Sequence, residues 1–364
     1  MAIGLDIGRK SIKAVALRKV DGGVKIGQGL TQEIPDPRIE AETEEEPKRA
    51  DIVSLLRQLW QKERWPGNKV VVGASGLRVV TRLVGFPHMP QDELKQVVEF
   101  EAQRHLPIDA SDLVIDYAPT GRDLPDQRMQ VILVGGSRQG VNRLIRQLES
   151  AKLRPVAIDV QSVAAYRALA SPFFEVAGTG HDQENIRKSE AGDATVLFDL
   201  GHEETRVNIF EERIPLVSRT VNMGGDAFTA ALARAQDMSF ADAENAKRQL
   251  GVTKSTSWRS PILRALEPAL QQLGRQLVQS LQFFAGEYRD KQIAGVYLHG
   301  GGAALPGLTD HLMEFLDEYG GGRIVWKNNQ PMVEVVGDLS DGENVLSGVQ
   351  YLTAAGLALW GVVS

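Results

Sequence analysis

The sequence predicts an α/β fold of two similar halves, because one strand-and-glycine pattern occurs twice along the chain. The copies span residues 3–8 and 196–201; each is a short apolar strand that ends in Asp-x-Gly and precedes a second strand. A triple glycine at 300–302 follows a third apolar strand. Glycine lets the backbone turn sharply and approach a ligand closely. The ordered set favours a nucleotide held between two halves.

A single copy of this pattern would carry little weight, since Asp and Gly are favoured in ordinary turns. Two copies about half a chain apart, followed by a triple glycine, are harder to attribute to turn statistics. Asp6 and Asp199 stand at the two turns. Mg²⁺ prefers oxygen ligands and keeps several waters, so two carboxylates and phosphate oxygens suffice to hold it. We therefore predict Asp6 and Asp199 as metal-site residues.

The composition excludes several other classes of protein. At 364 residues the chain is long enough for two or more domains with substantial cores. It has no cysteine, which excludes disulfides, thiolate metal sites and a cysteine nucleophile. The formal net charge of −6 argues against nucleic acid as the main partner. No apolar run approaches the ~20 residues of a membrane span, so we expect a cytoplasmic protein without direct membrane insertion.

The first half is expected to begin as a β-meander over residues 1–34, followed by a helix from Asp51 and a strand from Lys69. Residues 85–155 then have a separate pattern of predicted elements, in which strands alternate with two helices. This order is typical of a small inserted α+β subdomain. The polar, glycine-flanked stretch 178–192 is predicted as a mobile loop between the halves.

The second half is expected to repeat the first, with a strand meander up to Val221 and a helix after Gly224-Gly225-Asp226. Leucines spaced by three and four predict a long amphipathic helix over 262–291. The apolar segment 354–363 is predicted as a buried helix. The predicted boundaries are 1–84 for the first half, 85–155 for the insert, 156–177 for a return to the first half, 178–192 for the loop, 193–335 for the second half and 336–364 for a C-terminal return to the first half.

These motifs resemble those of the actin, Hsp70 and sugar-kinase ATPase superfamily, where they are known as phosphate-1, phosphate-2 and adenosine motifs. The resemblance implies an actin/Hsp70-like ATPase fold of two ribonuclease-H-like halves, with ATP and Mg²⁺ bound between them. The nucleotide-binding positions that it implies are Asp6, Gly8, Asp199, Gly201, Thr205, Gly224, Gly225, Gly300, Gly301 and Gly302.

Further charged residues match superfamily positions. Lys13 lies where relatives point a cation at the β-phosphate; the alternative is a strand lysine that faces solvent. Glu244 and Lys247, three apart on one helix face, match an E-x-x-K pair that contacts ribose and adenine in relatives. An ordinary surface ion pair is the alternative. Arg9 and Lys10 depart from the small polar residues common at this turn, and either strengthen phosphate binding or flank the pocket.

The position that would support hydrolysis matches the superfamily less well. Relatives that hydrolyse ATP quickly place a glutamine or an acid near Asp159 and Gln161 to orient the attacking water. Both residues are therefore candidates for a catalytic role, although the resemblance does not fix their geometry. The expected activity is slow ATP hydrolysis at most.

Residues 83–160 narrow the resemblance to one family. The motif P-x-M-P-x-x-E-L at 87–94, followed by E-A-x-x-x-x-P at 101–107, resembles the type IV pilus assembly protein PilM family, relatives of the division protein FtsA. The resemblance spans nearly the whole chain and leaves out only the loops at 36–50 and 178–192.

The family resemblance implies a cytoplasmic assembly platform for a type IV pilus or a related secretion machine. Members bind the short cytoplasmic tail of an inner-membrane, PilN-like partner in a groove beside the insert. Phe86 and Met89, which flank prolines in a loop, are candidate contacts here; the alternative is that they belong to the insert's own core. FtsA ends in a membrane-binding helix that this chain lacks, so recruitment to the inner membrane by the partner is expected.

Two other functions stay open at this point. One is a small-molecule kinase, acting on a sugar or an acid, on the same ATPase fold. The other is a nucleotide-free scaffold that kept the fold and lost the chemistry, which the unusual Arg9 and Lys10 would allow. Self-association is also left open by the sequence.

Overall fold

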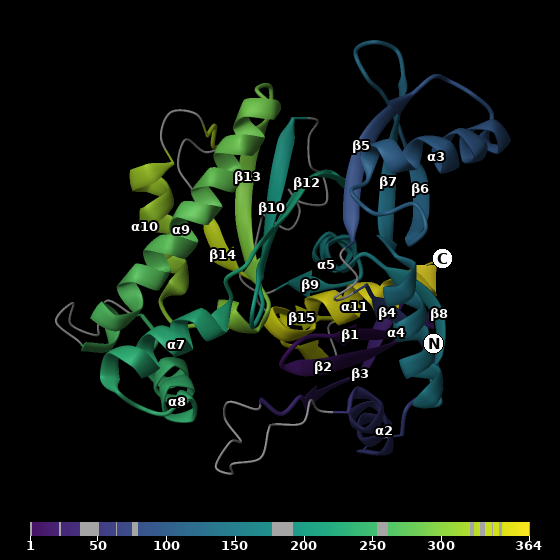
Figure 1. The fold of residues 1–364 in the computed structure, drawn as a ribbon. Coiled ribbons are helices and arrows are strands. Elements are labelled where there is room, and N and C mark those ends of the chain that lie inside the picture. Colours follow the sequence, from purple (N-terminus) through teal and green to yellow (C-terminus); the bar gives the residue numbers. More distant parts are fainter. Residues whose placement is uncertain are drawn as a thin grey trace.

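Two five-stranded sheets with the same strand order form the two halves of the fold (Figure 1). The first sheet has the order β3 (Gly23–Glu33), β2 (Ser11–Val20), β1 (Ala2–Ile7), β4 (Lys69–Gly73) and β8 (Arg154–Asp159). The second has the order β12 (Ile214–Val221), β11 (Thr205–Glu211), β10 (Asp193–Leu200), β13 (Gln292–His299) and β14 (Val333–Val335). In each, three antiparallel strands are followed by two parallel strands. The repeat confirms the predicted α/β fold of two similar halves.

The structure is a computed structural model. It describes residues 2–21, 23–36, 51–62, 64–74, 79–176, 192–252, 261–320, 324–327, 332–336, 338–341 and 344–363. The predicted mobile loop over 178–192 lies outside these residues except for Gly192. Both termini lie on the side of the first half (Figure 1).

Helices cover both faces of the first sheet, and the alternation of side chains along β2 assigns the faces. The helices are α2 (Ile52–Lys62), α4 (Arg138–Ser150), α5 (Gln161–Leu169) and α11 (Gly348–Val363). Val15 and Leu17 share one core with α5 and α11, whereas Ala14 and Ala16 share the other with α2 and α4. Successive side chains on a strand point to opposite faces. The last helix of the chain therefore helps to close the first half.

Two glycines let α11 lie very close to its neighbours. A Cβ on Gly356 would stand 1.7 Å from the carbonyl oxygen of Ala164 on α5. A Cβ on Gly4 of β1 would stand 1.9 Å from the carbonyl oxygen of Ala354. Both are far inside van der Waals contact with backbone atoms, so any larger residue would force α11 away from the sheet.

A separate antiparallel sheet with the order β5 (Val80–Phe86), β7 (Met129–Ser137) and β6 (Leu113–Asp123) is covered by α3 (Gln91–His105) (Figure 1). This small sheet begins before the predicted insert boundary at 85 and ends well before 155. The helix and strand that follow it, α4 and β8, belong to the first half, because Leu144 and Leu148 pack with Leu55 and Leu56 of α2. The apolar face of the small sheet is covered by α3. The apolar side chains of α4 pack against the first five-stranded sheet and α2 instead.

The expectation that Phe86 contacts a partner is wrong, because its side chain is buried. Its side chain is 3% exposed at the end of β5 and packs in the core of the small sheet with Leu94, Val98 and Val131. Met89 is half-buried against the same core. The alternative interpretation, that Phe86 belongs to the insert's own core, is therefore the one that the structure favours.

The second half is covered by a long helix that the leucine spacing predicts. Its helices are α7 (Gly225–Gln236), α8 (Phe240–Leu250), α9 (Pro261–Glu287), the 3₁₀ turn η1 (Gly301–Ala304) and α10 (Leu308–Tyr319). Leu266, Leu270 and Leu277 of α9 are fully buried against the second sheet. A short sheet of β16 (Val345–Leu346), β15 (Leu339–Ser340) and β9 (Glu175–Val176) completes the fold.

The two halves share an apolar contact beneath their sheets. Tyr166 of α5 stacks on Phe210 of β11 with ring centroids 4.4 Å apart, and Leu197 and Tyr297 of the second sheet belong to the same core. The small sheet also contacts the second half, through an ion pair of Arg122 on β6 with Glu211 on β11. The two halves are thus joined both by the apolar contact of α5 with β11 and by the ion pair of β6 with β11.

Candidate functional site

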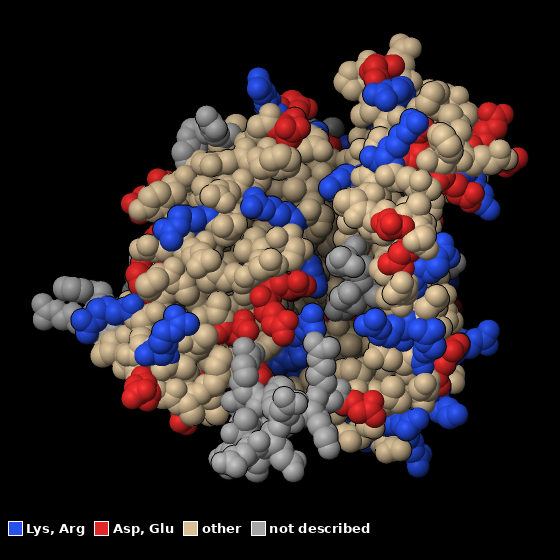
Figure 2. All heavy atoms as spheres, in the orientation of Figure 1, with Lys and Arg blue, Asp and Glu red and all other residues tan. Residues whose placement is uncertain are grey.

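A cleft of about 910 Å³ lies between the two halves and appears as a hollow in the space-filling view (Figure 2). Among the predicted site residues, those that line it are Asp6, Gly8, Lys13, Gln161, Asp199, Gly201, Gly225, Glu244, Lys247, Gly300, Gly301 and Gly302. The structure therefore brings together, in one cavity, residues from six separate segments of the chain between Asp6 and Gly302. Its volume is within the range of small-molecule and cofactor sites.

The two Asp-x-Gly hairpins have equivalent turns. The N–H of Gly8 donates to the carbonyl oxygen of Ser11 at 3.0 Å, and that of Gly201 donates to Glu204 at 3.0 Å. In each turn a short loop joins two antiparallel strands and faces the cleft. The duplication seen in the sequence is therefore a duplication of geometry.

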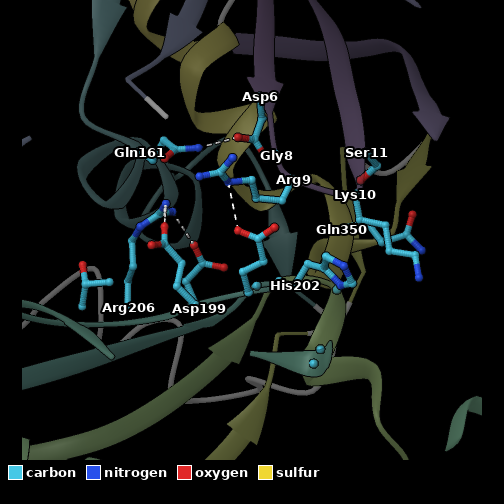
Figure 3. A pocket seen from close by; sticks show the side chains of 18 of the residues that line it. Asp6, Gly8, Arg9, Lys10, Ser11, Gln161, Asp199, His202, Arg206 and Gln350 are labelled. Carbon is cyan, nitrogen blue, oxygen red and sulfur yellow. Dashed lines mark hydrogen bonds and ion pairs between the residues drawn. The ribbon is translucent and has the colours of Figure 1, made fainter. Parts of the chain in front are cut away.

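Both predicted metal-site carboxylates already have side-chain donors (Figure 3). The Gln161 amide nitrogen donates to Asp6 Oδ1 at 2.6 Å. The Arg206 guanidinium pairs with Asp199 Oδ2 at 3.3 Å and also with Glu204. Burial would lower the pKa of Arg206, but the carboxylates of Asp199, Glu204 and Asp6 raise it above its ordinary value. A permanent positive charge thus stands between the two halves.

Arg206 is a residue that the sequence interpretation missed, although a signal for it was present. It follows Asp199 by seven positions, as Lys13 follows Asp6. In the antiparallel hairpins these residues are direct cross-strand partners, Asp6 with Lys13 and Asp199 with Arg206. Lys13 lines the cleft, so both basic residues stand at the edge of the same cavity.

The triple glycine approaches the second aspartate closely. Gly300 has a φ of 88°, and a Cβ on it would stand 2.4 Å from Asp199 Oδ1. Only glycine satisfies both conditions. His299 precedes Gly300 and is buried. Burial lowers its pKa below the ordinary 6.5, although the charges of Asp199 and Asp6 act in the opposite direction, so this imidazole is neutral near pH 7.

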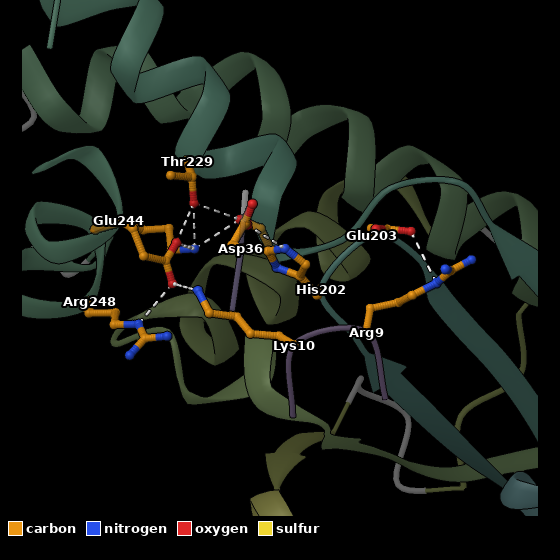
Figure 4. Close-up of polar contacts among 10 residues, drawn as sticks. Arg9, Lys10, Asp36, His202, Glu203, Thr229, Glu244 and Arg248 are labelled. Carbon is orange, nitrogen blue, oxygen red and sulfur yellow. Dashed lines mark hydrogen bonds and ion pairs between the residues drawn. The ribbon is translucent and has the colours of Figure 1, made fainter. Parts of the chain in front are cut away.

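Glu244 and Lys247 form a buried network rather than a surface ion pair (Figure 4). Lys247 Nζ lies 2.6 Å from Glu244 Oε2, 2.8 Å from Thr229 Oγ1 and 2.9 Å from the carbonyl oxygen of Gly225. Burial alone would raise the pKa of Glu244. The hydrogen bonds from Lys247 and Thr229 outweigh it and hold this pKa far below its usual range. The pair therefore fixes α8 against α7 at the edge of the cleft.

Arg9 and Lys10 of the first hairpin cross the cleft to the second half (Figure 4). Lys10 Nζ lies 3.1 Å from Glu244 Oε1, and Arg9 Nε lies 3.3 Å from Glu203 Oε2. The first pair is mostly buried, whereas both members of the second are at least half exposed. These two cations thus link the halves as well as flanking the pocket.

Three predicted residues have structural roles in place of the expected ones. The Asp159 carboxylate is held by Arg167 at 2.8 Å and does not line the cleft, so it is not placed to activate water. Thr205 is fully buried and its hydroxyl donates to the carbonyl oxygen of Met223. Gly224 also lies outside the cleft lining and is the N-cap residue of α7. Their neighbours in sequence, Gln161 among them, are the ones that reach the cavity.

The cleft fits a nucleotide better than it fits a metal ion on these side chains. Gly301, whose Cβ position has no neighbour within 4 Å, and the cations Lys13 and Arg206 offer room and charge for phosphates. A divalent ion on Asp199 would have to compete with Arg206 for the same carboxylate. Within the part of the chain that the structure describes, no three His, Asp or Glu side chains are grouped as metal ligands.

The model of one protein family, described as type IV pilus assembly protein PilM, matches residues 4–362. That match covers nearly the whole chain, including both hairpins, the small sheet and α11. This chain belongs to the PilM family. The resemblance seen in the motif around Pro87–Leu94 is thereby confirmed, and type IV pilus assembly is the process that the family serves.

Solved structures similar to this PilM-family chain include one of a PilM–PilN type IV pilus biogenesis complex. The identity is 25% over 99% of this chain and 98% of the other, with a TM-score of 0.75. The ethanolamine utilization protein EutJ of Carboxydothermus hydrogenoformans is 14% identical over 99% and 89% (TM-score 0.51). MreB5 of Spiroplasma citri bound to AMPPNP is 12% identical over 98% and 95% (TM-score 0.53). These likenesses confirm the predicted actin-like ATPase fold.

The described helices of this PilM-family chain do not have the properties of membrane spans. Among those that the structure describes, none combines the length and the hydropathy that a membrane crossing demands, and this includes the apolar α11.

Proposed function

We propose that this protein is an actin-like, nucleotide-binding assembly platform of a type IV pilus machine, which binds the cytoplasmic tail of a PilN-like inner-membrane partner. The observation that carries the proposal is the match to the PilM family over 4–362, together with the likeness to a chain solved in a PilM–PilN complex. The kinase alternative is not favoured by either comparison. By this proposal the protein works in the cytoplasm, at the inner face of the membrane.

The nucleotide part of the proposal rests on the geometry of the cleft. Two equivalent hairpins, the triple glycine and the Glu244–Lys247 edge line one cavity of about 910 Å³. ATP would lie with its phosphates between the hairpins and its adenosine toward α8 and η1. Hydrolysis is expected to be slow, because Asp159 is held by Arg167 and the Gln161 amide already donates to Asp6.

Gly301→Ala tests where the nucleotide lies. A Cβ on Gly301 meets no protein atom within 4 Å, so the variant should fold normally, yet that Cβ would enter the cleft. We expect at least a tenfold loss of ATP affinity by calorimetry, about 1.4 kcal/mol. Gly136→Ala on β7, which also has no neighbour within 4 Å and lies away from the cleft, should bind as wild type.

Two outcomes would contradict the nucleotide proposal. Unchanged affinity in Gly301→Ala would move the ligand away from the triple glycine. The absence of ATP binding by the wild-type protein would leave the nucleotide-free scaffold as its function. Phosphate release in the same samples is expected below ~1 s⁻¹, the low end for enzymes.

The partner part of the proposal places the tail on the small sheet. Met89 is the remaining candidate contact, because it is half-buried between Pro87 and Pro90, which are both exposed. A half-buried apolar side chain at a rigid turn offers an anchor for an extended peptide.

Capture of a synthetic PilN-like tail should be weakened at least tenfold by Met89→Glu. Phe100→Glu serves as the matched control, because Phe100 is a largely exposed apolar residue on α3 of the same small sheet. The cleft variant Asp199→Ala should capture the tail as wild type does. Capture lost in Phe100→Glu and kept in Met89→Glu would place the contact on α3 instead. Thermal unfolding of each variant checks that the small sheet is intact.

A further inference from the structure

Each phosphate hairpin places a basic residue directly across from its aspartate. Lys13 faces Asp6 in the pairing of β1 with β2, and Arg206 faces Asp199 in the pairing of β10 with β11. Directly opposed residues of an antiparallel pair point to the same face of the sheet. All four side chains line the cleft. The two halves therefore present matching carboxylate and cation pairs to one cavity.

The Arg206 side chain is fixed at this place by two carboxylates. Its Nη1 lies 3.3 Å from Asp199 Oδ2, and its Nη2 pairs with Glu204. Three-quarters of the side chain is buried, whereas Glu204 is 39% exposed and can turn toward water. A guanidinium keeps its charge at any physiological pH and presents several donors in a planar fork. Arg206 can therefore hold Asp199 with one edge and a phosphate with the other.

Lys13 complements this arrangement from the other half. Its ammonium forms no hydrogen bond or ion pair with the residues that the structure describes, although it lies across from Asp6. Asp6 instead accepts the 2.6 Å hydrogen bond from Gln161. A polyphosphate entering between the hairpins would thus meet the unpaired ammonium of Lys13 and the remaining N–H donors of Arg206, beyond those that pair with Asp199 and Glu204.

We propose that Arg206 takes the place of a divalent cation at the second phosphate hairpin. Its guanidinium neutralises Asp199 and binds the terminal phosphates of the nucleotide, opposite Lys13, so nucleotide binding persists without a divalent ion. This inference rests on the nucleotide binding proposed above. It replaces the expectation of Mg²⁺ held by Asp6 and Asp199, because a second cation on Asp199 would lie against the guanidinium. Arginine forks match phosphate oxygens well, which makes the exchange chemically reasonable.

The test measures ATP affinity by calorimetry in buffer with Mg²⁺ and in buffer with EDTA. The wild-type protein should lose less than about threefold in affinity when Mg²⁺ is replaced by EDTA. Arg206→Gln should lose more than about tenfold in EDTA, and Mg²⁺ should restore most of that loss, because Asp199 is then free to orient a hydrated ion. Arg206→Lys, which keeps the charge and loses the fork, should bind more weakly than wild type but still without a requirement for Mg²⁺.

Arg219→Gln is the matched control. Arg219 lies on the neighbouring strand β12 across from Val207, is exposed, and is absent from the cleft lining, so its loss removes one positive charge without touching the site. Its affinities should equal those of wild type in both buffers. If Arg206→Gln fails to fold, the ATP affinities of Arg206→Lys in the two buffers are compared with those of wild type instead.

The possible failures are distinguishable. Wild-type binding that needs Mg²⁺ overturns the role of Arg206 and leaves the proposed nucleotide binding intact. The same is true if Arg206→Gln binds ATP in EDTA as tightly as wild type does. No binding of ATP by the wild type in either buffer overturns the nucleotide proposal itself, and the role of Arg206 with it.

Discussion

Gly356→Ala should lower the stability of this protein by about 3 kcal/mol or more, at the upper end of the cost of overpacking. The added Cβ would stand 1.7 Å from the carbonyl oxygen of Ala164 and 2.4 Å from its carbonyl carbon. These are backbone atoms of α5, so no rotamer change relieves the clash and α11 must move away. The hydrogen bond from Arg167 to the Gly356 carbonyl oxygen, 2.9 Å long, would be strained with it. Denaturant unfolding measures the change.

Gly286→Ala is the matched control for that substitution. Gly286 lies near the end of α9, and a Cβ there meets nothing within 4 Å. Alanine has the higher helix propensity, so this variant should equal wild type or gain up to about 1 kcal/mol. A Gly356→Ala protein as stable as Gly286→Ala would show that α11 does not pack on α5 as closely as described.

Glu244→Gln should cost about 3–5 kcal/mol, the range for breaking a buried ion pair by removing one partner. The Glu244 carboxylate is the shared acceptor of Lys247, Lys10 and Arg248. Without it, three cations converge on a neutral amide, and Lys247 stays buried. The same variant should weaken ATP binding, because α8 forms one edge of the cleft. Equilibrium unfolding and calorimetry measure the two effects.

The pH dependence of this variant gives a further check. The folded-state pKa of Glu244 is depressed below its ordinary 4.5, so its contribution to stability is fully present above pH 4.5 and falls as the pH drops below that value. The stability difference between wild type and Glu244→Gln should therefore shrink between about pH 4.5 and pH 3. A difference that stays constant over this interval would contradict a charged Glu244 at the centre of the network.

Glu203→Gln is the matched control for Glu244→Gln, because it removes the other ion pair between the first hairpin and the second half. Glu203 and Arg9 are 50% and 60% exposed. Exposed pairs contribute little, so the loss should stay below about 1 kcal/mol. Equal losses in the two variants would mean that burial does not set the strength of these links.

Much of the site could be predicted from the sequence because its parts are local. A strand that ends in Asp-x-Gly and returns as a second strand specifies its own hairpin, so Asp6 and Asp199 were found together with their turns. The spacing of leucines in α9 is equally local. Phe86 was misjudged, since proline-flanked loops and strand ends look alike in sequence, and only the packing of α3 on β5 distinguishes them.

The sequence by itself therefore determined the duplicated α/β plan and the family, because hairpins, helices and motifs are short-range patterns. The tertiary structure alone decided which side chains meet across the cleft. Lys10 and Glu244 are 234 positions apart, and Gln161 reaches Asp6 over 155. Whether Asp199 faces a metal ion or Arg206 depends on which side chains share its face of the hairpin, and whether Asp159 is free depends on where Arg167 lies. The contacts of Lys10 with Glu244 and of Gln161 with Asp6 form only when distant segments fold against one another, so no local pattern encodes them.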